Sequence, residues 1–137
     1  MKPPPIFNGT CIDIYTHTSQ SERFFATLTR REERDFPIAA TILDRTVRIG
    51  RSPGGRAERI KGSSEGIWEL RVTPPGRSGP HTRCLYICDG RDILVLRGLR
   101  KAERGIPRGE IELAERAARA LRRHADEGSS GGYPRTA

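Results

Sequence analysis

Basic side chains recur along short strand-like runs in the second half of the chain. In the first of these runs Glu69 and Arg71 share one side, opposite to Leu70, because side chains alternate along a strand. Arg83 begins the next run. Guanidinium groups that converge on one sheet face bind a phosphate bidentately and stabilise negative charge on its oxygens. The spacing therefore predicts an anion site on a sheet.

Further basic residues nearby complete the candidate set. The residues expected to act on a phosphate directly are Arg71, Arg83, Arg100 and Lys101, and those expected to bind neighbouring phosphates are Arg59, Lys61, Arg97 and Arg104. The alternative is a group of solvated arginines paired with acidic neighbours such as Glu69, Asp92 and Glu103. For one arginine the two interpretations weigh equally, but for the whole set on one face a functional site is favoured.

The sequence does not support most other kinds of catalytic or cofactor-binding site. The sequence has no glycine-rich nucleotide motif and no GxSxG serine motif. His17, His81 and His124 lack metal-ligand spacing and the three cysteines lack CxxC spacing, so we expect neither a metal nor a cofactor. Trp68 is interpreted as an anchor in the core or at its rim, and the alternative is a platform for base stacking.

Composition limits the class of protein. The chain has 137 residues, a formal net charge of +8 and a pI of about 10.2. This excess favours a polyanionic partner, although an arginine bias also arises from GC-rich coding. The length predicts one domain. No apolar run approaches the ~18 residues of a membrane span and the first residues lack the apolar core of an export signal, so we expect a soluble cytoplasmic protein without a membrane partner.

The first half of the chain predicts a strand and two helices. Residues 11–16 alternate with period two, which is typical of a strand. Ser19 and Ser21 offer N-caps for a first helix. Asp35 and Pro37 indicate the start of a second helix.

The second half predicts three strands and a last helix. The strands fall near 66–73, 83–88 and 92–97, and Asp89-Gly90 predicts a tight turn between the last two. Pro107 is expected to be the first residue of an amphipathic helix.

Together these elements predict an α+β fold, with an N-terminal strand and a helical hairpin packed on a small antiparallel sheet, followed by a C-terminal helix. We expect two layers, with the helices on one sheet face and the other face open to a ligand. The single domain is expected to span residues 10–126, after an extended lead-in at 1–9 and before a flexible tail at 127–137.

A series of short matches runs through the segment Arg59–Ala114. Its members are Lys61, the run Gly66-Ile67-Trp68-Glu69-Leu70-Arg71, Arg83 opening a strand that contains Tyr86, the pair Arg100-Lys101, Pro107, Glu110-Ile111 and Ala114. In order and spacing the chain resembles the phage Gp49-like, HigB-type branch of the RelE toxin superfamily of type II toxin–antitoxin systems. The two preceding helices fit the helical hairpin of that family.

The resemblance implies the RelE-like microbial ribonuclease toxin fold. It also implies a metal-free mRNA endoribonuclease, or mRNA interferase, that acts on the translating ribosome and inhibits translation. A cognate antitoxin, expected to be a helix-turn-helix protein, would neutralise it. By position, Arg71 and Arg83 match the residues that hold the scissile phosphate, Arg100 and Lys101 match the basic pair after the last strand, and Lys61 matches a basic position before the sheet.

The groups that transfer protons stay open. Cleavage by the 2′-hydroxyl needs a base and an acid, and arginine does not deprotonate in proteins. The candidate bases are Glu69, Lys101 with a lowered pKa, and His81, although Glu69 is better interpreted as orienting Arg71. Thr82 stands where the family often has an aromatic residue. The alternative function is a catalytically inactive basic module that binds RNA or DNA.

Overall fold

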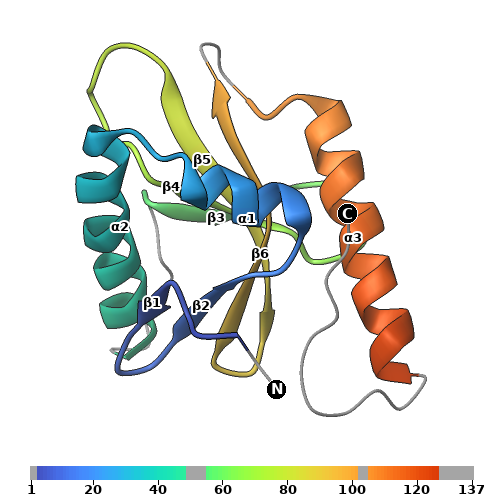
Figure 1. Cartoon of the computed structure of the whole chain (residues 1–137). Helices are drawn as coiled ribbons and strands as arrows, with labels where there is room; N and C mark the ends of the chain where they lie inside the picture. Colours follow the sequence, from blue (N-terminus) through green and yellow to red (C-terminus); the bar gives the residue numbers. More distant parts are fainter. Residues whose placement is uncertain (1–2, 49–54, 102–104, 127–137) are drawn as a thin grey trace.

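The computed structural model describes residues 3–48, 55–101 and 105–126. The strands are β1 (Phe7–Asn8), β2 (Asp13–Thr16), β3 (Ala57–Arg59), β4 (Trp68–Arg71), β5 (His81–Asp89) and β6 (Asp92–Lys101), and the helices are α1 (Ser19–Ala26), α2 (Arg30–Arg48) and α3 (Arg108–Asp126). The six strands form one sheet in the order β1-β2-β6-β5-β4-β3 (Figure 1). Only the β2–β6 pair among these is parallel. The expected α+β fold is therefore confirmed.

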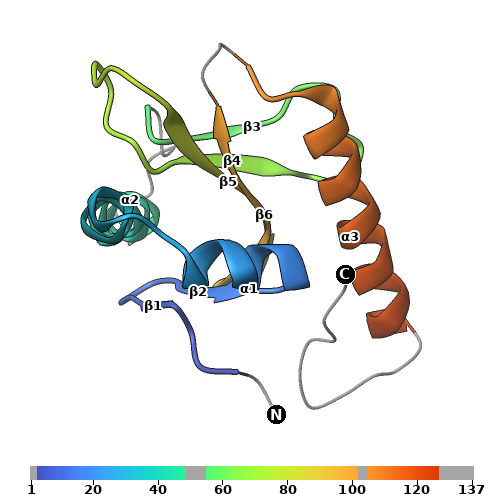
Figure 2. The ribbon, with the colours of Figure 1, turned by 45° about the horizontal axis from the view of Figure 1, so that its top comes forward.

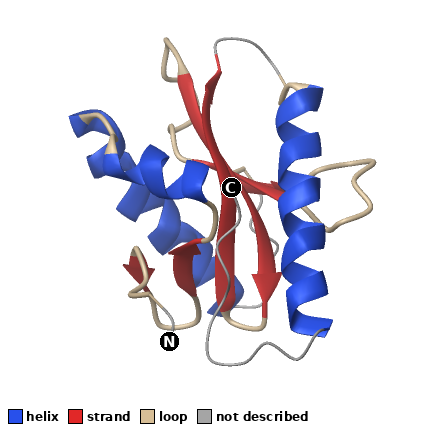
Figure 3. Ribbon diagram, turned by 45° about the vertical axis from the view of Figure 1, so that its right-hand side comes forward, coloured by secondary structure: helices blue, strands red, loops and turns tan. Residues whose placement is uncertain are grey.

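Helices cover both faces of the sheet, which differs from the expected two layers. Helices α1 and α2 lie on one side and α3 lies on the other (Figures 2 and 3). One core joins Phe36 of α2 to Tyr86, and a second core joins Ala118 of α3 to Leu94. The reason is the unbroken apolar run at 93–96, which presents apolar side chains to both faces and so requires cover on both.

Helix α2 begins at Arg30, earlier than the start expected at Asp35 and Pro37. Thr29 and Glu32 form a capping box: the Glu32 N–H donates to Thr29 Oγ1 (3.2 Å) and the Thr29 N–H donates to Glu32 Oε1 (2.8 Å). Pro37 lies inside the helix, where it removes one backbone donor. The chain thus enters α2 almost directly after α1, with a short connection that includes Thr29.

The three predicted strands of the second half are confirmed, and β5 and β6 extend beyond their predicted ends. The turn between them contains Gly90 with a φ of 60°, which glycine adopts without strain. Two short strands were not predicted: β1 lies within the expected lead-in at 1–9, and β3 lies before the first of the three strands predicted in the second half. The expected tail at 127–137 lies outside the described residues.

Helix α1 is fixed to the second half of β6 at Gly98. The side-chain amide of Gln20 donates to the Gly98 carbonyl (2.7 Å) and its oxygen accepts from the Gly98 N–H (2.9 Å). A Cβ atom at this position would lie 2.2 Å from the Phe24 ring. Glycine therefore lets the helix pack closely on the strand that ends at Lys101. None of the described helices is both long and apolar enough to cross a membrane.

Candidate anion-binding site

A hollow of about 420 Å³ lies on the α3 side of the sheet, where β3, β4, β5 and the end of β6 come together. Its described lining contains five basic side chains and two carboxylates: Arg59, Lys61, Arg71, Arg83 and Lys101, with Glu58 and Glu69. Ile106, which precedes helix α3, and Ile111, in the first turn of that helix, supply an apolar part of the wall. The balance of charge suits an anion.

Arg83 is the most deeply set of these cations, with only 8% of its surface exposed. Its Nε donates to Glu69 Oε2 (2.9 Å) and its Nη1 donates to the Thr82 carbonyl (3.1 Å). Burial lowers the pKa of Arg83, and Glu69 opposes that effect. Both carboxylate oxygens of Glu69 face arginines, since its Oε1 lies 3.6 Å from Arg71 Nη2. Glu69 therefore orients the two guanidinium groups and is poorly placed to act as a base.

Arg71 lies directly opposite Arg83 in the pairing of β4 with β5. Its Nη2 donates to Glu58 Oε2 (2.6 Å) and its Nη1 donates to the Gly55 carbonyl (3.3 Å). The Glu58 side chain is more than half exposed, so this contact lies at the rim of the hollow. An anion that enters the hollow therefore meets Arg71 before Arg83.

Lys101 differs from both arginines in its surroundings. No hydrogen bond or ion pair holds its amine within the described part of the chain. Burial lowers the pKa of Lys101, and the charges of Arg83 and Arg71 lower it further, while Glu69 opposes the shift. An amine in this position can bind an anion and also releases its proton more readily than a solvated lysine.

Arg100 lies on the opposite face of the sheet, away from Lys101, because neighbouring residues of a strand point in opposite directions. Its Nη2 and Nε donate to the two oxygens of Glu32 at 2.7 and 2.8 Å. Its guanidinium carbon also lies 4.6 Å from the centre of the Phe24 ring. The structure therefore does not bring Arg100 into the hollow, and this corrects the expectation that it would act beside Lys101.

The remaining predicted residues divide into two groups. Arg59 and Lys61 line the hollow, as expected. Arg97 is held by both oxygens of Glu110 in α3 (2.9 and 3.3 Å), so it anchors the helix. His81 pairs with Lys101 across β5 and β6 but does not line the hollow. Arg104 lies outside the described residues.

Two acidic residues matter that the sequence did not single out. Glu58 belongs to β3, a three-residue strand with no recognisable pattern, so nothing in the sequence marked it. Glu32 could have been found from the Thr29-x-x-Glu32 capping box. It also accepts a hydrogen bond from the Thr82 hydroxyl (2.5 Å), which gives this position a buried polar role. Within the described ranges no cluster of three or more histidine, cysteine or carboxylate side chains could hold a metal ion.

The fold and the hollow define a small α+β protein with a basic site between its sheet and its last helix. The model of the family described as "Phage derived protein Gp49-like (DUF891)" matches residues 20–119, which include every predicted site residue. The chain belongs to this Gp49-like family. No curated protein matches it.

Proposed function

We propose that this protein is the toxin of a type II toxin–antitoxin system and cleaves mRNA as a metal-free endoribonuclease. The observation that carries the proposal is the Lys101 amine, which has no acidic partner in the described residues and faces the same hollow as Arg71 and Arg83. Membership in the Gp49-like family supports a toxin-type role. The net charge of +8 supports a polyanionic substrate such as mRNA on a ribosome.

The geometry supports separate roles for Arg83 and Arg71 around one phosphate. Arg83 uses two of its five N–H groups on Glu69 and Thr82, so further donors are left for phosphate oxygens. Arg71 adds a second positive charge at the rim. These guanidinium groups would stabilise the charge that builds on phosphorus when the 2′-hydroxyl attacks. Their positions are fixed by Glu69 and Glu58 before substrate arrives, so little reorganisation is needed.

Lys101 is the group we assign to proton transfer. In its neutral form the amine takes the proton of the 2′-hydroxyl as the new oxygen–phosphorus bond forms and the bond to the 5′-oxygen breaks. The departing 5′-oxygen takes up a proton from solvent water, so the products would be a 2′,3′-cyclic phosphate and a 5′-hydroxyl. The lowered pKa of Lys101 supports this role, because it increases the fraction of neutral amine near pH 7.

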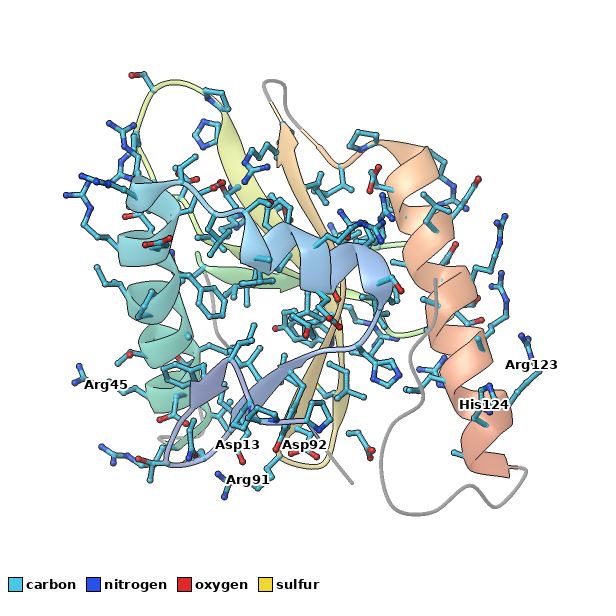
Figure 4. All side chains as sticks on the ribbon, viewed as in Figure 1. Asp13, Arg45, Arg91, Asp92, Arg123 and His124 are labelled. Atoms are coloured by element: carbon cyan, nitrogen blue, oxygen red, sulfur yellow. The ribbon has the colours of Figure 1, made fainter. Side chains whose placement is uncertain are left out.

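The test is cleavage of cellular mRNA after induction of the protein, with new 5′ ends mapped by primer extension. We expect cuts within codons for the wild type, and a loss of at least tenfold for Lys101→Met and for Arg71→Gln. Arg45→Ala is the matched control, because Arg45 is exposed on α2 and points away from the sheet (Figure 4). Full cleavage by both site variants would contradict the assignment of the hollow.

The partners are part of the same proposal. We expect a cognate antitoxin, a small helix-turn-helix protein encoded next to this one, to restore growth when both are expressed. Cleavage of naked and ribosome-bound mRNA should be compared, because the proposal favours the bound form in the cytoplasm.

A non-catalytic basic module is the second candidate. It is favoured by the carboxylate partners of Arg71 and Arg83, which occupy part of the donor capacity of each guanidinium. Salt-dependent RNA binding by the purified wild type without any cleavage, on or off the ribosome, would favour this candidate.

A further inference from the structure

A second hollow, of about 640 Å³, adjoins the first along strand β3. The two hollows share Glu58, Arg59, Ile60, Lys61 and Arg71, so β3 and the residues that follow it form the wall between them. Only the second hollow is lined by Trp68, together with small residues such as Gly62 and Ser63. A bound polymer that extends from the first hollow across this wall would enter the second hollow.

Trp68 is the only tryptophan of the protein. Its indole stacks on the buried ring of Tyr86, with ring centres 6.4 Å apart and an angle of 22° between the planes. It is only partly buried, because it also borders the hollow. An aromatic ring that is held in place by a second ring behind it, and that borders an open hollow, is suited to stacking with another flat ring.

Positive charge continues from one hollow to the other. Arg59 and Lys61 are exposed, line both hollows, and have no carboxylate partner among the described residues. Arg71 and Trp68 lie three residues apart on β4, which corresponds to about 10 Å along the strand, and their side chains leave opposite faces of the sheet. The two hollows therefore meet around the edge strand β3. Cations on the wall with an aromatic ring beyond them are the features that bind single-stranded nucleic acid.

We propose that the second hollow is a subsite for a nucleobase next to the phosphate held in the first hollow. The base stacks on Trp68, and Arg59 and Lys61 bind the phosphates that connect the two positions. This inference rests on the proposed function, because it assumes a single-stranded RNA in the first hollow. Stacking reads the flat face of a base, so the subsite tolerates different bases and prefers the larger purines.

The probe is an RNA hexamer of adenines that is 2′-O-methylated throughout, so that it binds without being cleaved. A second hexamer has the same sugars and phosphates but no bases. Since Trp68 is the only tryptophan, the tryptophan fluorescence comes from this one position. We expect saturable quenching by the adenine hexamer, and about tenfold weaker binding with no quenching by the abasic hexamer.

Variants separate stacking from charge. With a labelled adenine hexamer, Trp68→Leu should weaken binding about tenfold without changing its dependence on salt, and Trp68→Phe should restore most of the affinity. Arg59→Gln and Lys61→Gln should each lower the salt dependence by about one released counterion. Arg45→Ala, on the far side of α2, is the control for loss of one charge outside both hollows.

Two results would overturn the inference in different ways. If the wild type binds both hexamers equally and Trp68 fluorescence does not change, the base subsite is wrong and the phosphate site of the first hollow stands. If the wild type binds neither hexamer at low salt, the proposed function fails and the subsite fails with it.

Discussion

At the scale of the residue, Lys101 and Arg100 show how much one position along a strand matters. Both are basic and adjacent, yet Arg100 pairs with Glu32 while the Lys101 amine faces the hollow with Arg83. Arginine in a two-point ion pair holds a structure together, whereas an amine that forms no ion pair is available for chemistry.

The first prediction concerns the pH dependence of cleavage. Because only the neutral amine of Lys101 accepts a proton, the rate should rise with pH and level off below the ordinary lysine value of 10.5. Lys101→Arg keeps the charge but cannot deprotonate, so it should lose both the activity and the rising limb. Single-turnover cleavage between pH 6 and 10 measures this. An Arg variant with full activity would assign Lys101 a purely electrostatic role.

A second prediction concerns the buried pair of Arg83 and Glu69, whose side chains are each 10% exposed. Arg83→Met leaves the Glu69 carboxylate buried with only the more distant Arg71, so it should cost about 3–5 kcal/mol of stability. Adding Glu69→Gln should recover a large part of the lost free energy of unfolding, as measured in urea. The double variant should still not cleave mRNA. Activity in the double variant would show that Arg83 does not contact the phosphate.

At the scale of the element, the packing of α1 on β6 decides where the end of β6 lies. Gly98→Ala places a methyl group 2.2 Å from the Phe24 ring, so the helix must move. We expect the free energy of unfolding, measured in urea, to fall by about 1–3 kcal/mol.

Gly109→Ala in α3 is the matched control for Gly98→Ala. A Cβ atom at Gly109 meets nothing within 4 Å, and alanine favours the helix, so this change should stabilise the protein by about 0.5–1 kcal/mol. A neutral Gly98→Ala would mean that α1 adapts without cost.

Elements with strong periodic patterns could be predicted from the sequence, and short ones could not. The apolar runs of β5 and β6, their Asp89-Gly90 turn and the amphipathic α3 all carried clear signals. Strand β3 has three residues, and its pairing with β4 is the reason it is a strand. Helix α2 begins earlier than Pro37 indicates, because the capping box at Thr29 sets its start and the helix accommodates the proline in its interior.

At the scale of the whole molecule, Glu32 connects three elements of the fold. It lies in α2 and accepts hydrogen bonds from Arg100 of β6 and Thr82 of β5. Burial alone would raise its pKa, but the hydrogen bonds from Arg100, Thr82 and Thr29 outweigh this and lower the pKa to about 2. The carboxylate therefore stabilises the protein in its charged form.

The last prediction follows from that shift. A lowered pKa in the folded state gives stability that is present above about 4.5 and lost as the pH falls toward 2. The contribution is about 3 kcal/mol. Glu32→Gln should lower stability at pH 7 and flatten its decline between pH 4.5 and 2, as measured by urea unfolding. An unchanged acid profile in this variant would show that other carboxylates, such as Asp44, control it.

The charges at the two ends of the sheet differ. The basic hollow lies where β6 ends, about 30 Å along that strand from its start. At the start of β6, Asp92 lies beside Asp13 of β2, and Arg91 pairs with Asp13 at 3.3 Å (Figure 4).

The sequence by itself determined the class of fold, the last three strands, the last helix and a set of basic residues on them. These features depend on local periodicity and turn chemistry, which neighbouring residues specify. The tertiary structure decided which cations meet: it placed Arg71, Arg83 and Lys101 around one hollow, turned Arg100 to the other face, and committed Arg97 to Glu110. Strand register and the pairing of each guanidinium with its carboxylate arise from contacts between distant segments, which no local pattern specifies.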